Sequence, residues 1–341
     1  MAPAPQWKKA RILWNPSAGR GRSASQAKVL AKQLESFADS TEFVSTEGPD
    51  HLIRSAAEAR AQQFDLVWIA GGDGSVHLAA RGLLENGIGP IPHLGILPLG
   101  SANDLAFGLG LKADWWKKGE AHAAVIDHGW IRCAQGPEIA FVNGAGLGIN
   151  AMVTIRSRKI SFVRGLGLYT LALLQALVLD WKRRRWQVCL EGRRLFSSDD
   201  PENLPVSHFP KSGNRDLEGE KNTERASWLA LSVMNGRREG NFDLAPMARL
   251  SDGNFELLAV RDLSRLRALT LLPSLLLGGL GEKPPWLTRY RGKDLTIKAA
   301  EDLAVHADGE LLAVPGDSVR EVSIRLQPLG LPVLVGPRFE S

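Results

Sequence analysis

The sequence contains little cysteine and no long hydrophobic run. Only Cys133 and Cys189 occur among its 341 residues, which is too few for a disulfide framework and suits a reducing cytoplasm. The longest leucine-rich stretch, 166–179, falls short of the roughly 20 apolar residues that a membrane-spanning helix needs. The N-terminal residues lack the apolar core of a secretory signal. Neither export nor a transmembrane anchor is expected.

Three motifs of common nucleotide-binding proteins are also absent. The chain has no Walker A run and no His-Arg-Asp loop of protein kinases. Glycines at 144, 146 and 148 do not have the Gly-x-Gly-x-x-Gly spacing of a dinucleotide site, and they do not open a first βαβ unit. These absences argue against P-loop enzymes, protein kinases and dinucleotide oxidoreductases.

Length and composition are those of an ordinary folded protein. Hydrophobic residues make up 44% and charged residues 23% of the chain, which argues against wholesale disorder. A length of 341 residues is enough for two domains, each with its own core. The net charge of +5 favours anionic partners, such as nucleotides, acidic membrane surfaces or nucleic acid, without choosing among them.

The first part of the chain alternates short apolar runs with segments of helical period. Helices are expected to begin near Ser23, Pro49 and Ser75, where apolar residues follow at helical spacing. Strands are expected at 11–14, 42–45, 65–70 and 94–97. This alternation is typical of βαβ units around a parallel sheet. An α/β domain is therefore predicted over residues 10–125.

The second part of the chain has the period-two alternation of antiparallel strands. It is clearest at 186–191, 228–233, 255–260 and 322–326. The polar stretch 197–227 is predicted to be a long exposed loop without chemistry. A second, β-rich domain is therefore predicted over residues 126–330.

Glycines surround an acid after the most apolar predicted strand. Gly71, Gly72 and Gly74 flank Asp73, and Ser75 follows. Ligands bind at the carboxyl ends of parallel strands, and glycine lets backbone N–H groups approach phosphate oxygens. Asp73 would be repelled by bare phosphate, so it indicates a bound Mg²⁺ or a hydroxyl partner. The plain alternative is a tight turn from strand to helix.

Two more polar loops are expected at the same edge of the sheet. The loop 98–105 contains Gly100, Ser101, Asn103 and Asp104; Asn103 or Asp104 could simply cap the next helix. The loop 15–22 has small residues and two arginines, which suit a nucleotide's phosphates. Two neighbouring acidic loops favour function over a purely structural role.

These motifs together resemble the diacylglycerol kinase catalytic-domain family, which includes sphingosine and ceramide kinases and bacterial lipid kinases. The resemblance lies in the segments 15–19, 71–75, 98–106, 141–148, 235–236, 245–253 and 308–310. Their shared order spans nearly the whole chain. The family pattern usually has Thr where this chain has Ser75 and Ser101, and a hydroxyl is kept in both places.

The resemblance implies a fold and two cofactors, ATP and Mg²⁺. Family members have an N-terminal α/β domain like that of phosphofructokinases and NAD kinases, followed by an antiparallel β-sandwich, with the active site between them. The C-terminal tail is expected to pack back on the first domain. The residues implied to bind the nucleotide are Asn15, Ser17, Gly19, Thr46, Gly71, Gly72, Gly74, Ser75, Gly100, Ser101 and Asn103.

The same resemblance implies roles for several acids. Asp308 matches the proposed general base, and Glu310, Asp73 and Asp104 match acids around the metal and the acceptor. The pair Asp308–Gly309 could equally be a hairpin turn.

A second metal site is implied away from the catalytic acids. Asp252 matches a structural Mg²⁺ ligand of the bacterial members, assisted by carbonyls at Arg249 and Asn254. Here the alternative is another Asp-Gly turn, and the residues alone favour neither.

The acceptor implied by the resemblance is a lipid at the inner face of the membrane. Cations on both sides of the apolar segment 166–179 suit an anionic membrane surface. That segment or 269–280 could form the lipid cleft, or both could be core. No nucleic-acid partner is expected, and a homodimer stays open. The alternatives are a soluble-metabolite kinase of the NAD kinase type and a non-catalytic nucleotide- or membrane-binding protein.

Overall fold

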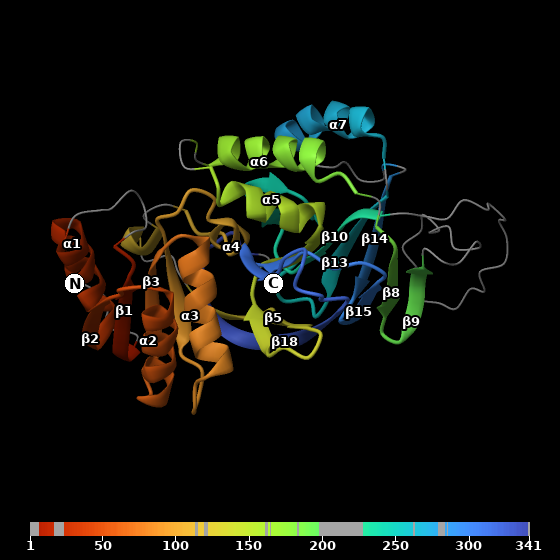
Figure 1. The fold of residues 1–341 in the computed structure, drawn as a ribbon. Coiled ribbons are helices and arrows are strands. Elements are labelled where there is room, and N and C mark those ends of the chain that lie inside the picture. Colours follow the sequence, from red (N-terminus) through yellow and green to blue (C-terminus); the bar gives the residue numbers. More distant parts are fainter. Residues whose placement is uncertain are drawn as a thin grey trace.

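The first part of the chain forms a parallel sheet with helices on its faces (Figure 1). The computed structural model describes residues 7–16, 24–112, 115–118, 122–160, 163, 165–182, 184–197, 228–261, 263–278, 284 and 286–339. The parallel strands lie in the order β2 (Ala38–Ser45), β1 (Trp7–Trp14), β3 (Leu66–Gly71) and β4 (His93–Pro98). All four predicted strands are confirmed. Strand β3 is buried along its whole length, as a central parallel strand should be.

Four α-helices and two short 3₁₀ helices accompany these strands in the described residues. The α-helices are α1 (Ala24–Leu34), α2 (Pro49–Ala61), α3 (Asp73–Glu85) and α4 (Asp104–Gly108). The 3₁₀ helices are Glu35–Phe37 and Trp115–Lys118. Helix α3 begins at Asp73, two residues before its predicted start, because Gly72 already has the extended backbone of an N-cap.

The second part of the chain forms an antiparallel sheet that faces strands of the first sheet. Its order is β14 (Leu287–Gly292), β13 (Phe255–Arg261), β10 (Trp228–Met234), β7 (Gly144–Gly148), β16 (Val305–Ala307) and β17 (Glu310–Ala313). A small separate hairpin consists of β11 (Arg238–Glu239) and β12 (Phe242–Asp243). The predicted α/β plus antiparallel β architecture is confirmed.

Strand β18 (Glu321–Val335) connects the two parts. It lies parallel to β4, with Val333 opposite Leu94, and antiparallel to β15 (Asp294–Ala299) and β5 (His122–Cys133). The remaining strands of this sheet are β6 (Glu138–Phe141), β8 (Trp186–Leu190) and β9 (Arg193–Ser197). Among the described strands, one ten-stranded sheet therefore runs through both parts. The predicted boundary at residue 125 falls inside β5.

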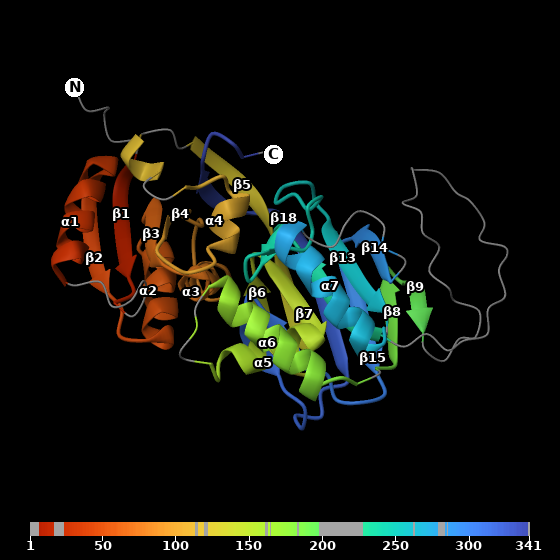
Figure 2. The same ribbon diagram turned by 90° about the horizontal axis from the view of Figure 1, so that it is seen from above.

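Two apolar layers cover the two faces of strand β10. Between the sheets, Trp186 and Trp228 are buried in one core with Phe141 and Phe255, whose rings stack with centroids 5.6 Å apart. The opposite face is covered by α5 (Ile149–Ser157), α6 (Leu166–Leu179) and α7 (Arg265–Gly278), which lie together in both views (Figures 1 and 2). Because it is covered on both sides, β10 is buried at every residue.

Helix α6 is part core and part surface. Ala172, Ala176 and Leu177 are buried against the sheet, whereas Val178 and Leu179 are 53% and 63% exposed. The alternative that this segment is core therefore holds for only part of the helix. No helix in the described part of the chain is long and apolar enough to span a membrane.

Candidate active site

Two loops at the carboxyl ends of neighbouring strands pack against each other. The loop 71–75 follows β3, and the loop 98–104 follows its parallel neighbour β4. A Cβ added at Gly72 would lie 2.9 Å from the Cα of Gly100, and one at Gly100 would lie 2.5 Å from the Cα of Gly72. Glycine is needed at both positions, because any side chain would push the two backbones apart. The loops therefore share one edge of the sheet, as predicted.

Predicted nucleotide residues from three strands lie along this edge. Nδ2 of Asn15 donates to Oγ of Ser75 at 2.8 Å. The Thr46 side chain is buried, and its hydroxyl donates to the carbonyl of Trp14 at 3.0 Å. These residues follow β1, β3 and β2, which are adjacent strands. The predicted Ser17 and Gly19 lie outside the described residues.

Asp73 joins the two loops. Its Oδ2 accepts the backbone N–H of Asn103 at 2.7 Å, and its Oδ1 accepts that of Asp104 at 2.6 Å. Asp73 therefore satisfies the N-terminus of α4, and no side-chain cap comes from Asn103. The Asn103 side chain instead bonds the backbone N–H and carbonyl of Gly100. Burial raises the pKa of Asp73, and the two N–H donors oppose this rise.

Asp104 holds the turn between β11 and β12. Its Oδ2 accepts the N–H of Gly240 at 2.6 Å, and its Oδ1 accepts that of Asn241 at 3.1 Å. Burial, and then the charge of Asp73, raise the pKa of Asp104 to about 7. A carboxyl with this pKa gains and loses a proton near neutral pH.

Asp308 lies in a tight turn between β16 and β17. Asp308 and Gly309 have positive φ angles of 48° and 82°, as expected for a two-residue hairpin. The alternative interpretation of this pair as a hairpin turn is confirmed. The turn does not exclude chemistry, because the Asp308 side chain points inward and is 4% exposed.

The Asp308 carboxylate is surrounded by hydrogen-bond donors. The backbone N–H groups of Val142, Asn143 and Gly144 donate to it at 2.7, 2.8 and 2.8 Å. Nδ1 of His77 on α3 lies 3.0 Å from its Oδ2. Burial raises the pKa of Asp308, but the His77 contact and the backbone donors outweigh burial, so the pKa lies below its ordinary value. The carboxylate is a firmly held anion that joins α3 to the second part.

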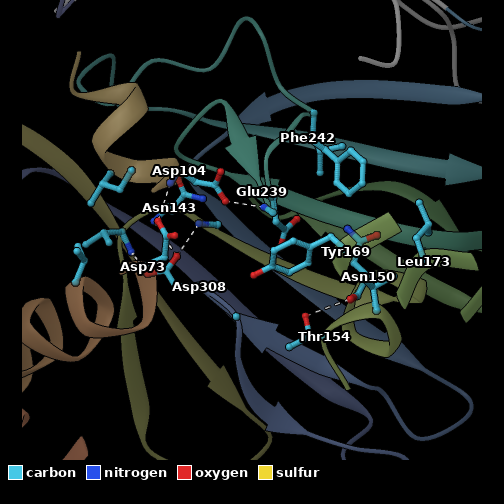
Figure 3. A pocket seen from close by; sticks show the side chains of 18 residues that line it. Asp73, Asp104, Asn143, Asn150, Thr154, Tyr169, Leu173, Glu239, Phe242 and Asp308 are labelled. Carbon is cyan, nitrogen blue, oxygen red and sulfur yellow. Dashed lines mark hydrogen bonds between the residues drawn. The ribbon is translucent and has the colours of Figure 1, made fainter. Parts of the chain in front are cut away.

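A pocket connects these three aspartates to an apolar wall. Figure 3 shows Asp73, Asp104 and Asp308 together at one end. Side chains from α5, α6 and the segment 242–244 line the other end. The apolar and aromatic residues of this wall are Val153, Tyr169, Leu173, Phe242 and Leu244. The pocket therefore offers hydrogen-bond acceptors at one end and an apolar surface at the other.

Besides the predicted nucleotide residues, two further sets of predicted site residues do not line this pocket. The Glu310 side chain is 40% exposed, and its Oε2 pairs with Nη2 of Arg158 at 2.9 Å. Arg249, Asp252 and Asn254 belong to a separate loop after β12. The structure thus brings together Asp73, Asp104 and Asp308 but not the other predicted acids.

The contacts of Asp252 do not fit the predicted structural Mg²⁺. Its Oδ2 pairs with the guanidinium of Arg291, and its Oδ1 accepts the N–H of Asn254 at 3.0 Å. A guanidinium on the same oxygen repels a divalent cation. The Asx-type turn, the alternative for this segment, is present, since Gly253 has a φ of 71°.

The sequence reasoning missed several polar residues at the site, among them His77 and Glu239. His77 lies four residues after Asp73 on α3, and residues at this spacing share a helix face, so a usable signal was present. Glu239 lines the pocket, and its Oε1 lies 3.0 Å from Nε2 of buried His306. Glu239 had no local signal, because it belongs to a two-residue strand.

Two family descriptions match nearly the whole chain. "Diacylglycerol kinase catalytic domain" matches residues 9–133, and "YegS C-terminal NAD kinase beta sandwich-like domain" matches residues 144–335. The chain belongs to the diacylglycerol kinase catalytic-domain family. The predicted resemblance is confirmed.

Named relatives and a solved structure agree with this membership. A protein of Chromohalobacter salexigens named "Probable lipid kinase YegS-like" is 31% identical to this chain. The match covers 67% of this chain and 64% of that protein. The diacylglycerol kinase of Bacillus subtilis is 24% identical over 92% of this chain and 93% of its own length. A crystal structure of a diacylglycerol kinase from Bacillus anthracis has a TM-score of 0.67 at 17% identity, with 98% and 99% of the two chains covered. That last likeness shows the shared fold.

Family membership defines the class of enzyme. The diacylglycerol kinase family consists of lipid kinases, so this chain is a lipid kinase, and kinase chemistry implies the use of ATP. The lipid acceptor, the role of each acid and the domain limits stay predictions.

Proposed function

We propose that this lipid kinase transfers the γ-phosphate of ATP to the hydroxyl of a diacylglycerol-, sphingoid- or ceramide-type lipid. The main support is the division of the pocket into a carboxylate end and an apolar end. Acceptors of this class have the same division, with a hydroxyl beside long apolar chains. The chains gain free energy when the apolar wall removes them from water. Because the Bacillus subtilis relative is named diacylglycerol kinase, diacylglycerol is the first acceptor to test.

In this proposal the nucleotide lies on the first domain, 10–125, and the lipid on the second, 126–330. The glycine loop leaves room for a ligand, since a Cβ at Gly74 would meet nothing within 4 Å. Asn15 and Ser75 hold each other in place at this edge. Backbone N–H groups at the start of α3 favour an anion such as a phosphate. The aspartates then lie between the nucleotide and the apolar wall.

Mg²⁺ that arrives with the nucleotide fits beside Asp73 and Asp104. Asp104 is buried and Asp73 is half-buried. After burial itself, repulsion by the charge of Asp73 contributes to the rise of the Asp104 pKa to about 7. A divalent cation would relieve this repulsion. The described residues hold no cluster of three or more His, Cys, Asp or Glu that suits a metal, so phosphate oxygens would complete the coordination. Bound there, Mg²⁺ would neutralise charge on the transferred phosphoryl group.

Two aspartates are candidates to accept the proton of the attacking hydroxyl. Asp308, the predicted general base, is oriented by His77 and three backbone N–H groups, although the same donors lower its pKa. Asp104 has a pKa of about 7, which suits a general base at neutral pH. We keep Asp308 as the proposed base, with Asp104 as the second candidate.

Helices α6 and α7 support a peripheral contact with the inner face of a membrane. Helix α6 has no charged residue, and its side chains Tyr169 and Leu173 line the lipid pocket. At the start of α7, Leu266 is 74% exposed between exposed Arg265 and Arg267. Exposed leucine between cations suits shallow insertion into an anionic surface.

The test is a phosphorylation assay with labelled ATP against separated lipid classes, with mass spectrometry of the product. We expect label in one lipid class that carries a free hydroxyl. Label that appears in NAD and in no lipid would favour the soluble-metabolite kinase. Binding of ATP or vesicles without any turnover would favour the non-catalytic protein.

A further inference from the structure

Three carboxylates gather around the loop 249–254, away from the catalytic pocket. Glu256 on β13 is 1% exposed, and Asp127 on β5 is fully buried. Oδ2 of Asp127 accepts the N–H of Gly253 at 2.7 Å, which brings Asp127 next to Asp252. The charge of Asp252 raises the pKa of both other carboxyls, after the larger effect of burial. Such a group of acids needs a cation.

Arg291 on β14 supplies a cation inside this group. Its Nε lies 2.9 Å from Oε1 of Glu256, and its Nη2 pairs with Oδ2 of Asp252. The guanidinium has a rigid fork of donors, so one side chain can bridge two carboxylates. Oε2 of Glu256 is buried without a hydrogen-bond partner. One acceptor oxygen of this group thus has no protein donor.

We propose that Arg291 is a built-in cation that takes the place of a structural Mg²⁺ at Asp252. The guanidinium provides the positive charge that Asp252 and Glu256 require, at a position where a divalent ion would otherwise be needed. Without Arg291, the carboxylates of Asp252 and Glu256 would form a site for a hard cation, since carboxylate oxygens are its preferred ligands.

This cation stabilises a loop that reaches the catalytic domain. Leu250 is 4% exposed and belongs to the core of the first part. A Cβ at Gly108 on α4 would lie 3.1 Å from Cδ1 of Leu250, so the loop packs against the helix that begins with Asp104. The carbonyl of Leu250 also accepts the N–H of Asp127 at 2.6 Å. Arg291 therefore supports the position of α4 from the second sheet.

Thermal unfolding of the nucleotide-free protein in EDTA and in MgCl₂ tests the proposal. Arg291 already neutralises Asp252 in the parent, so no Mg²⁺ should bind there. The parent and Asp252→Asn should therefore show the same Mg²⁺ response, and any response comes from another site. Arg291→Gln should unfold at a lower temperature in EDTA, by on the order of 5 °C. MgCl₂ should restore much of this loss, and the double variant Arg291→Gln with Asp252→Asn should not recover.

Arg325→Gln is a matched control. Arg325 is 44% exposed and pairs with Glu138 at 3.1 Å, and Arg291 is 39% exposed. Arg325→Gln should gain no response to Mg²⁺. Two results would overturn the proposal: a parental midpoint that rises in MgCl₂ more than that of Asp252→Asn, or an Arg291→Gln variant that behaves like Arg325→Gln. If Arg291→Gln does not fold, the comparison of the parent with Asp252→Asn still decides. None of these outcomes depends on which lipid is phosphorylated.

Discussion

The aspartates at the site have different pKa values because their neighbours in the fold differ. Asp308 accepts three backbone N–H groups and faces His77, and its pKa lies below the ordinary value. Asp104 accepts two backbone N–H groups but lies beside Asp73, and burial with this charge brings its pKa to about 7. Partners, rather than residue type, decide which carboxylates are charged near neutral pH.

Replacing Asp308 should abolish most of the catalysis. We expect Asp308→Ala to lower kcat by about 10²- to 10⁴-fold, the usual contribution of a general base, and to leave nucleotide affinity unchanged. Stability should also fall by about 1–3 kcal/mol, because three buried N–H groups lose their acceptor. Steady-state kinetics, nucleotide titration and thermal unfolding measure these effects.

Asp317→Ala is the control for this change. Asp317 lies in an exposed turn, where its Oδ2 accepts the N–H of Val314 at 2.8 Å. Its replacement should leave kcat unchanged. An Asp308→Ala variant with the parental rate would exclude Asp308 as the base.

The pH dependence of kcat/KM distinguishes Asp104 from Asp308. A general base must be ionised, so activity falls as the pH drops through its pKa, and kcat/KM reports the free enzyme. If Asp104 is the base, kcat/KM should fall about tenfold per pH unit below pH about 7. If Asp308 is the base, kcat/KM should stay level well below this pH, because its pKa is lowered. A level profile would thus reject Asp104 and support Asp308.

Helix α6 differs from the other helices in having apolar residues on every side. A helix of this composition is normally buried all round, yet Leu166, Val178 and Leu179 are 39%, 53% and 63% exposed. The buried side packs on the sheet and lines the pocket. These three exposed side chains are apolar. A bilayer surface would cover them.

Charges on this surface should weaken membrane binding. We expect Leu179→Glu with Leu266→Glu to lower binding to vesicles of anionic lipid by at least about tenfold, since each burial of a leucine is worth about 1.5–3 kcal/mol. Both side chains are largely exposed, so folding should be unaffected. Vesicle co-sedimentation measures the change.

Ile88→Glu provides the matched control, because Ile88 is 83% exposed and follows α3 in the first part. It should bind vesicles like the parent. Equal binding by all three proteins would remove α6 and α7 as the membrane contact.

Strands β5 and β18 connect the two parts of the molecule within one sheet. The register of β18 with β5 shifts between Gln327 and Leu331. Before the shift β18 also pairs with β15 in the sandwich, and after it β18 reaches β4 of the parallel sheet. The two parts that border the pocket are therefore joined by strands that pass through both.

A cavity in β18 should destabilise both parts together. Leu331 is fully buried, and Leu331→Ala should cost about 2–5 kcal/mol in a single cooperative transition. Leu329→Ala, two residues earlier at a 59% exposed position, should change stability by less than about 0.5 kcal/mol. Calorimetry follows the transition. Two separate transitions, one of them unaffected by Leu331→Ala, would contradict this continuity.

Local patterns predicted the secondary structure well. The four parallel strands and the helices near residues 23, 49 and 75 follow from apolar periodicity and capping residues, which act over a few neighbouring positions. The glycine motif also predicted the edge of the sheet where the loops meet, because parallel strands end on the same side. The family motifs predicted the architecture and the class of enzyme.

Long-range pairings were beyond the reach of these patterns. Nothing local shows that His77 contacts a residue 231 positions away, or that Arg291 pairs with Asp252. Side-chain type and spacing thus determined the elements and the chemistry available. Only the fold decided which carboxylates share the pocket, which are neutralised by a cation and which retain a proton near pH 7, because burial and distance between charges exist only after the chain has packed.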